Sequence, residues 1–137
     1  MTEIRQLMSP KVVTARASTP ISTAARLMRD ADVGDVLVTD HDELVGIVTD
    51  RDIVVRGLAG EADKATPIGE IATDTVATVR ASDPVERAEE MMRHYAVRRL
   101  PVVDHDTAVG VISLSDLTRF EDKVSPLASI TAWPPNN

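Results

Sequence analysis

Two short segments of this chain combine a glycine, a hydroxyl and a carboxylate in a spacing that suits a phosphorylated ligand. The first reads Gly-Ile-Val-Thr-Asp-Arg-Asp over residues 46–52, and the second reads Gly-Val-Ile-Ser-Leu-Ser-Asp over residues 110–116. A hydroxyl and free backbone N–H groups at a helix start favour a phosphate. A carboxylate three residues later can accept hydrogen bonds from both hydroxyls of a ribose, and glycine permits close approach of the backbone.

The same spacing has a purely structural interpretation. Ser/Thr-x-x-Asp at a helix start is close to a capping box, in which the two side chains satisfy backbone N–H groups and no ligand is needed. Two copies at matched positions favour a ligand more than one copy does, although a duplication also preserves caps. Both interpretations stay open at this point.

The two segments belong to a repeat that covers most of the chain. Residues 4–55 align without a gap on residues 68–119, an offset of 64 positions, and 18 of the 52 pairs are identical. A unit of this length cannot bury its apolar face alone. We therefore expect two packed halves, in which a site built by one half has a counterpart in the other.

Composition narrows the class of protein. The chain has 137 residues, enough for one compact module, and its 22 acidic and 15 basic residues give a net charge of −7. This charge repels polyanions and argues against nucleic acid as the main partner. The absence of cysteine excludes disulfides, thiolate catalysis and cysteine zinc sites. Because neither a signal peptide nor a membrane-spanning run is found, we expect a cytoplasmic protein with no membrane partner.

Each half is expected to contain a strand, a helix, two strands and a second helix. This is an α/β (α+β) arrangement, in which the two β-α-β-β-α repeats pack pseudo-symmetrically and helices cover small sheets. The first strand is placed at residues 12–14 and 76–78. The next two strands flank polar Asp-His-Asp turns at 40–42 and 104–106.

The helices show start signals and apolar periodicity. Thr19 before Pro20, and Asp83 before Pro84, predict a capping side chain with proline at the first helical position. The second helix of each half is expected to start near Thr49 or Ser113. The apolar stripes of the first helices are predicted to contain Ile21, Ala24, Ala25, Met28, Val85, Ala88, Met91 and Met92.

Three parts are expected along the chain: a first repeat at residues 1–60, a second at 61–122 and a tail at 123–137. Residues 57–67 contain two glycines and a proline and are predicted to link the halves. The tail ends in Trp-Pro-Pro-Asn-Asn, unlike anything in the repeat. It is either a frayed terminus or a segment that folds over a partner subunit, with Trp133 as its anchor.

The sequence resembles a known family. Two tandem units that close with Gly-h-h-Thr/Ser-x-x-Asp, where h is hydrophobic, are similar to a pair of cystathionine β-synthase (CBS) domains, often called a Bateman module. The match is carried by Gly-Ile-Val-Thr-Asp-Arg-Asp-Ile-Val at 46–54 and by Val-Arg-Arg-Leu-Pro-Val-Val-Asp at 97–104. It extends over about residues 4–120. The chain most resembles small stand-alone bacterial pairs, among them the hypoxic response proteins of mycobacteria.

The resemblance implies a non-catalytic regulatory module that requires no cofactor. Its ligand would be AMP, ADP, ATP or S-adenosylmethionine, bound in the cleft between the repeats. Carried over by position, Asp52 and Asp116 would hold the ribose hydroxyls, and Thr49 and Ser113 would contact phosphate or ribose oxygens. The base pockets would be lined by strand residues, namely Val12, Thr14, Val36, Val38, Val76, Thr78, Leu100 and Val102. The candidate phosphate partners are Arg51, Arg98 and Arg99.

The two halves differ where a ligand would bind. The first half has Gly-Asp at 34–35 where the second has Arg-Arg at 98–99. A carboxylate disfavours an anionic ligand that two arginines would favour. The first half also has Asp-Arg at 50–51 where the second has Leu-Ser at 114–115. We therefore expect the halves to bind unequally.

Other polar residues do not indicate catalysis or a metal site. His41 and His105 lie in turns between aspartates, which are ordinary turn formers. Each turn supplies three ligands in sequence with no second histidine nearby in the chain, which does not favour a metal site. His94 is expected to cap a helix or to face solvent. No nucleophile is paired with an orienting base.

Two functions stay open. The first is a sensor in which an adenosine-type ligand changes how halves or subunits pack. The alternative is a homodimeric interaction protein with vestigial, non-binding sites, whose Ala- and Met-rich helices pack between subunits. Because helices must cover the sheets in any case, the same stripes also fit an internal core. The downstream protein partner is not identified by the sequence.

Overall fold

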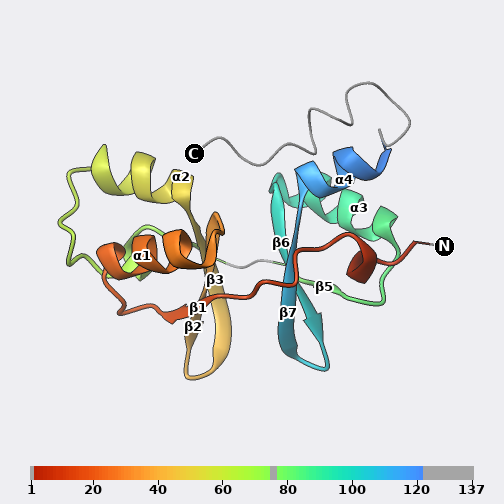
Figure 1. Ribbon diagram of the computed structural model, residues 1–137, viewed down its shortest axis with the longest axis horizontal. Helices are drawn as coiled ribbons and strands as arrows, with labels where there is room; N and C mark the ends of the chain where they lie inside the picture. The colour runs from red at the N-terminus through yellow and green to blue at the C-terminus, as the bar shows by residue number, and fades with distance from the viewer. Residues whose placement is uncertain (1, 75–76, 122–137) are drawn as a thin grey trace. The chain divides into compact units, whose positions relative to one another are not determined.

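The computed structural model describes residues 2–74 and 77–121, which form two compact units. The first-repeat unit is Lys11–Val76, and the second-repeat unit combines Met1–Pro10 with Ala77–Asn137. Each unit joins a small β-sheet to helices (Figure 1). The expected mixed α/β fold class is therefore confirmed. The predicted tail and Trp133 lie outside the described residues.

The sheet of the first-repeat unit has the strand order β1-β2-β3-β4. β1 (Thr14–Arg16) runs parallel to β2 (Asp35–Asp40). β3 (Glu43–Thr49) pairs antiparallel with β2 and with β4 (Thr73–Asp74). Because β2 lies between two neighbours, its apolar centre Val-Leu-Val is at most 1 % exposed, as a strand covered on both faces requires.

Helices cover this sheet and supply half of its core. α1 (Ile21–Ala31) connects β1 to β2, and α2 (Asp50–Asp52) follows β3 and continues as the π-helix η2 (Ile53–Leu58). The 3-10 turn η3 (Ile68–Glu70) precedes β4. The buried core consists of Ile21, Ala24, Met28, Val36, Val38, Val48, Ile68 and Ile71. Ala25 is exposed, so the apolar stripe of α1 is narrower than predicted.

The second-repeat unit repeats this plan. Within its described residues, β5 (Val79–Arg80) runs parallel to β6 (Arg99–Asp104), which pairs antiparallel with β7 (Thr107–Ser113). α3 (Val85–Tyr95) connects β5 to β6, and α4 (Leu114–Glu121) follows β7. The buried core consists of Ile4, Val79, Ala81, Val85, Ala88, Met92, Leu100, Val102, Ile112 and Leu117.

Both hairpins turn through His-Asp pairs with left-handed backbone. His41 and Asp42 have φ of 49° and 64°, and His105 and Asp106 have φ of 49° and 66°. Positive φ at both central residues is the mark of a type I′ turn, whose twist matches that of the flanking strands. The predicted turns at 40–42 and 104–106 are confirmed.

The segment that starts each sequence repeat packs in the unit of the other repeat. Ile4 opens the first repeat, yet it is fully buried in the core of the second-repeat unit, within the turn η1 (Ile4–Gln6). Its counterpart Ile68 is fully buried in the core of the first-repeat unit. In Figure 1 the red N-terminal turn belongs with the green and blue elements β5 to α4. The compact units are thus offset from the sequence repeats.

The predicted side-chain caps of α1 and α3 are wrong. The N-cap residues are Pro20 and Pro84, and neither helix start has a side-chain cap. The carboxylate of Asp83 instead accepts a hydrogen bond from the backbone N–H of Arg80, at 2.8 Å. It therefore stabilises the turn before the helix rather than the helix start.

Main-chain carbonyls take the place of these caps. The Ile21 N–H donates to the Thr66 carbonyl at 2.9 Å, and the Ser22 N–H donates to the Lys64 carbonyl at 3.1 Å. At the matched position of the second-repeat unit, the Val85 N–H donates to the carbonyl of Thr2, at 3.1 Å. These bonds satisfy donors that a helix start leaves without an intrahelical partner. Residues 57–67, which the sequence predicts to link the halves, are thereby built into the first-repeat unit.

We call residues 2–10 and 64–74 the exchanged segments, because each packs in the unit of the other repeat. Gly46 and Gly110 lie where an exchanged segment pairs antiparallel with a strand. A Cβ atom on Gly46 would be 2.8 Å from the Thr73 carbonyl oxygen, and one on Gly110 would be 2.5 Å from the Ser9 carbonyl oxygen. Both distances are shorter than van der Waals contact allows. The close approach that the sequence assigns to these glycines is therefore made by the chain's own backbone.

We expect Gly46→Ala and Gly110→Ala each to lower the free energy of unfolding by about 1–3 kcal/mol, because the backbone at Thr73 or Ser9 must shift to admit the new methyl group. Urea denaturation measures this loss. Gly57→Ala is the control, since its Cβ would be 3.7 Å from the nearest atom, Ile21 Cδ1, and alanine favours a helix. An equal loss in all three variants would contradict this explanation.

Candidate functional site

The hydroxyl and carboxylate of each motif lie where a strand ends and a helix begins. Thr49 is the last residue of β3 and the N-cap of α2, and Asp52 is the last residue of α2. Ser113 is the last residue of β7, and Asp116 lies in the first turn of α4. The strand-to-helix transition predicted for both motifs is therefore present in both units.

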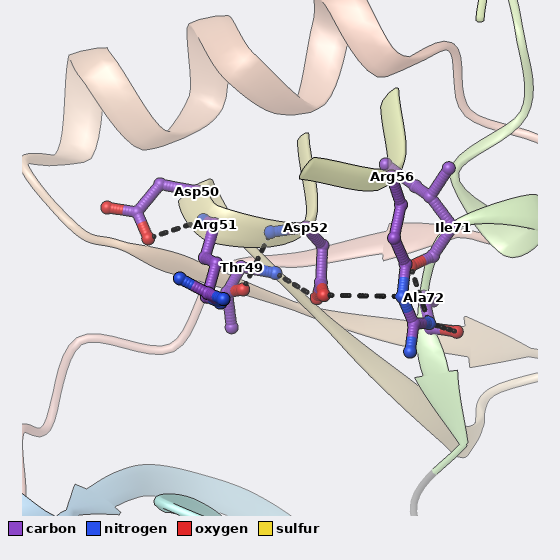
Figure 2. Close-up of polar contacts among 7 residues, drawn as sticks. All are labelled: Thr49, Asp50, Arg51, Asp52, Arg56, Ile71 and Ala72. Atoms are coloured by element: carbon purple, nitrogen blue, oxygen red, sulfur yellow. Dashed lines mark hydrogen bonds and ion pairs between the residues drawn. The ribbon is translucent and has the colours of Figure 1, made fainter. Parts of the chain in front are cut away.

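Each motif forms a capping box. In the first-repeat unit the Thr49 N–H donates to Asp52 Oδ2 at 2.9 Å, and the Asp52 N–H donates to Thr49 Oγ1 at 3.1 Å (Figure 2). In the second-repeat unit the Ser113 N–H donates to Asp116 Oδ2 at 2.8 Å, and the Asp116 N–H donates to Ser113 Oγ at 3.2 Å. The structural interpretation of the spacing is confirmed. The cap uses Oδ2 of each carboxylate and leaves Oδ1 for a different partner.

An arginine faces the other oxygen of each carboxylate. Arg56 Nε lies 4.0 Å from Asp52 Oδ1, and Arg119 Nη2 contacts Asp116 Oδ1. The aspartate side chains are only 14 % and 10 % exposed. Neither arginine belongs to the motif that predicts the site, although a base three or four residues after an acid on a helix is a known pairing signal.

Arg56 also reaches the exchanged segment. Its Nη1 lies 3.3 Å from the Ile71 carbonyl oxygen and 3.5 Å from the Ala72 carbonyl oxygen (Figure 2). Asp52 is thereby linked through one guanidinium to the backbone that precedes β4. At the position 64 residues later, Phe120 packs against the apolar core of the second-repeat unit.

Sheet register brings the divergent positions of the two halves onto the motifs. Asp35 lies opposite Thr49 across the β2–β3 pair, and Arg99 lies opposite Ser113 across the β6–β7 pair. The carbonyl of the residue before each accepts a hydrogen bond from a backbone N–H at the helix start. Gly34 O accepts from the Asp50 N–H at 3.0 Å, and Arg98 O accepts from the Leu114 N–H at 2.8 Å.

A hollow of about 370 Å³ lies at the start of α4 in the second-repeat unit. The predicted phosphate partners Arg98 and Arg99 line it together with Ser113 of the motif. The Ser115 hydroxyl lies 3.2 Å from that of Ser113. Its charged lining is entirely basic. The lining residues are Arg98, Arg99, Ser113, Leu114, Ser115 and Thr118.

The two helix starts differ in one hydrogen bond, which is made in the first-repeat unit and has no counterpart in the described part of the second-repeat unit. Asp50 Oδ1 accepts a hydrogen bond from the Arg51 N–H at 2.8 Å (Figure 2). The equivalent residues in the second-repeat unit are Leu114 and Ser115. Leucine has no acceptor, and no group among residues 2–74 and 77–121 accepts a hydrogen bond from the Ser115 N–H.

The CBS domain family model matches the chain twice, at residues 4–58 and at residues 68–123. The chain belongs to the CBS domain family. The two matches coincide with the two copies of the internal repeat, so the resemblance described from the motifs is confirmed.

Related proteins support this assignment over most of the chain. Hypoxic response protein 1 of Mycobacterium tuberculosis is 35 % identical over 121 residues, which cover 87 % of this chain and 85 % of that protein. The CBS domain pair of protein MJ0100, solved with 5′-methylthioadenosine and S-adenosyl-L-methionine, has a TM-score of 0.78 at 28 % identity, covering 91 % of this chain and 99 % of that one. The CBS domain protein PAE2072 from Pyrobaculum aerophilum, complexed with AMP, has a TM-score of 0.76 at 28 % identity, covering 94 % and 99 %.

The residues predicted to line the base pockets of the CBS repeats fall into two groups. Val36, Val38, Leu100 and Val102 are at most 1 % exposed and fill the cores, so any contact they make with a ligand would come from their main-chain atoms. Val12 is half-buried, and Thr14 and Thr78 are exposed. Val76 lies outside the described residues. The assignment of these residues to a base pocket stays a prediction.

The histidines do not form a metal site among the residues that the structure describes. His41 and His105 each lie within 3.0 Å of the preceding aspartate and are almost fully exposed. His94 is exposed beside the Tyr95 ring. Among the described residues, no three histidine, aspartate or glutamate side chains are grouped to hold a metal ion. The same residues contain no helix that is both long enough and apolar enough to span a membrane.

Two glutamates meet between α3 and α4. A side-chain hydrogen bond with Glu121 raises the pKa of Glu89 above its ordinary value, and burial and the charge of Glu121 raise it further. Arg93 acts in the opposite direction. The folded chain therefore binds a proton at Glu89 more tightly than the unfolded chain does.

This pair gives the CBS chain a pH-dependent term in its stability. A raised pKa contributes stability below the ordinary value of 4.5, and this contribution is lost as the pH rises through the raised value. At neutral pH we expect Glu89→Gln to unfold at a higher temperature than the wild type, with a difference that shrinks as the pH falls toward 4. Glu90→Gln, on the same helix, is the control. A difference that does not change with pH would contradict this account.

The capping box of the second CBS repeat can be tested in the same way. Ser113→Ala removes the acceptor of the Asp116 N–H, so we expect it to lower the free energy of unfolding by about 1 kcal/mol. Ser113→Thr, which copies the first repeat, should retain the stability of the wild type within about 0.5 kcal/mol. Thermal unfolding followed by circular dichroism measures both. Equal losses would mean that the hydroxyl does not cap α4.

Proposed function

We propose that this CBS pair is a non-catalytic regulatory module that binds adenosine-containing ligands, with Asp52 and Asp116 as the ribose-binding carboxylates. The observation that carries the proposal is the matched setting of these two side chains. Each lies at a strand-to-helix transition, is 14 % or 10 % exposed, and is oriented by a cap on one oxygen and an arginine on the other. A carboxylate already held in place loses little side-chain entropy on binding.

The capping box and a ribose can share one carboxylate. An ionised carboxylate offers about four acceptor positions on its two oxygens. In each unit the backbone N–H uses one position on Oδ2, and the arginine faces Oδ1. Lone pairs are left for the two hydroxyls of a ribose. The cap therefore prepares the site instead of replacing it.

The ligands of related pairs support the adenosine class. The two solved pairs described above hold 5′-methylthioadenosine with S-adenosyl-L-methionine in one case and AMP in the other. These ligands share the adenosine moiety and differ in the charge carried at its 5′ end. For this chain we propose AMP, ADP, ATP or S-adenosylmethionine as the regulatory ligand, with no required cofactor.

We place the phosphate of a nucleotide in the hollow of the second-repeat unit. Arg98 and Arg99 line it, and so does Ser115 in the first turn of α4, where backbone N–H groups lack intrahelical acceptors. Guanidinium groups form charge-assisted hydrogen bonds with phosphate oxygens, and the positive end of the helix dipole adds to them. Asp116 in the same turn would then hold the ribose. This unit is therefore the proposed nucleotide site.

The second candidate function is a homodimeric interaction protein whose nucleotide sites do not bind. It is favoured by the exposed apolar residues of η2, because Val54, Val55 and Leu58 are 56 %, 48 % and 72 % exposed. Clustered apolar exposure of this kind marks contact surfaces. A regulatory module also needs a downstream protein, so this surface is compatible with both functions.

We expect isothermal titration with AMP, ADP, ATP and S-adenosylmethionine to show binding to the wild-type protein. Asp116→Asn should weaken nucleotide binding at least about tenfold, because the amide retains a cap acceptor but lacks the charge that strengthens ribose hydrogen bonds. Asp104→Asn, at the far end of β6, is the control and should bind like the wild type. No binding by the wild type would reject the proposal in favour of the interaction protein, for which light scattering gives the oligomeric state.

A further inference from the structure

The two CBS repeats treat the same backbone donor in opposite ways. In the first-repeat unit the Arg51 N–H at the helix start is occupied by the carboxylate of Asp50, at 2.8 Å (Figure 2). In the second-repeat unit the equivalent N–H, that of Ser115, has no acceptor among the described residues, because Leu114 replaces the aspartate. One helix start thus carries an anion of its own, and the other does not.

A second carboxylate stands near the occupied helix start. Asp35 lies opposite Thr49 in the β2–β3 register, where the second-repeat unit has Arg99 opposite Ser113. A phosphate at the first-repeat motif would meet two carboxylates and one guanidinium, that of Arg51. At the second-repeat motif it would meet two guanidinium groups and no carboxylate in the lining of the hollow. Like charges at close range oppose binding, and unlike charges favour it.

We propose that Asp50 is a specificity-determining residue of the first-repeat site. Its carboxylate takes the place on the Arg51 N–H that a ligand phosphate would need, so this site accepts an adenosine derivative whose 5′ end is uncharged or cationic. Phosphorylated adenosine is directed to the second-repeat site. The inference rests on the proposed function, because it assumes that Asp52 holds a ribose, and it names the ligand class that each site takes.

Asp50 is suited to this role because it is not needed for the ribose contact. The cap of α2 is made by Thr49 and Asp52, and among residues 2–74 and 77–121 the Asp50 carboxylate is bonded only to the next backbone N–H. Its side chain is exposed, so replacing it removes a charge and an acceptor without opening the core. The residue at this position can therefore change the ligand class and leave the fold intact.

The experiment exchanges the two residues between the sites. AMP and 5′-methylthioadenosine are titrated calorimetrically into the wild type, Asp50→Leu and Leu114→Asp. Each is also tested with Asp116→Asn, which weakens the second-repeat site so that the remaining binding reports the first. We expect Asp50→Leu to raise the AMP affinity of the first-repeat site about tenfold and to leave its affinity for 5′-methylthioadenosine within about twofold. Leu114→Asp should lower the AMP affinity of the second-repeat site by about tenfold.

A ligand-free measurement tests the contact itself. Hydrogen exchange of the Arg51 amide should become several-fold faster in Asp50→Leu, and exchange of the Ser115 amide should become slower in Leu114→Asp. Asp50→Asn keeps an acceptor without a charge. It should retain slow exchange at Arg51 while still raising AMP affinity, because the repulsion between the carboxylate and the phosphate is removed.

The outcomes separate the two proposals. If both ligands bind but Asp50→Leu leaves the AMP affinity of the first-repeat site unchanged, the inference about Asp50 is wrong and the proposed function stands. Equal AMP binding by the two wild-type sites overturns the inference in the same way. If the wild type binds neither of these ligands nor ADP, ATP or S-adenosylmethionine, the proposed function fails and the inference fails with it. A gain of AMP binding in Asp50→Leu together with a loss in Leu114→Asp supports both.

Discussion

The structure depends on backbone hydrogen bonds between each unit and the segment that opens the other repeat's sequence. Thr66 and Lys64 accept from the first N–H groups of α1, and Thr2 accepts from the start of α3. The same segments carry Ile68 and Ile4, both fully buried, into the two cores. A helix start needs acceptors for its free N–H groups, and a short sheet needs an apolar cover. In each unit one such segment provides both, because it supplies the acceptors at the helix start and a buried isoleucine to the core.

The repeat allowed most of the fold to be predicted, because a 64-residue self-similarity fixes the type and order of elements in both halves. The exchange could not be predicted from it. Since Ile4 and Ile68 are the same residue in the same pattern, either copy of the segment is equally complementary to either sheet, and periodicity cannot choose between them. The prediction of side-chain caps for α1 and α3 was wrong for a related reason. Thr19 and Asp83 are suitable cap residues, but the carbonyl groups that replace them come from a distant part of the chain, and main-chain acceptors leave no trace in residue type.

At the candidate site the sequence presented two interpretations of Ser/Thr-x-x-Asp, a cap or a ligand site, as if one excluded the other. The geometry shows why they are compatible. The cap uses Oδ2 and turns Oδ1 toward an arginine one turn later, so the side chain is oriented before any ligand arrives. What the sequence could not supply is the burial of the strand residues. In many sheets the buried residues of a strand alternate with half-buried ones. Here the central strand is covered on both faces, and the side chains of Val36, Val38, Leu100 and Val102 belong to the cores.

The differences in charge beside the two motifs lie outside the cores, and this placement has a physical basis. Core positions of a duplicated fold are constrained by packing, because a change of one methylene is felt by every neighbour. Positions 34–35, 50–51, 98–99 and 114–115 lie outside the two buried cores, so they can change charge without disturbing the fold. Substitutions at these exposed or half-buried positions change the charge beside each motif, while Asp52 and Asp116 are the same residue in both units. A shared framework can therefore carry opposite charge at its two helix starts without a change in the fold.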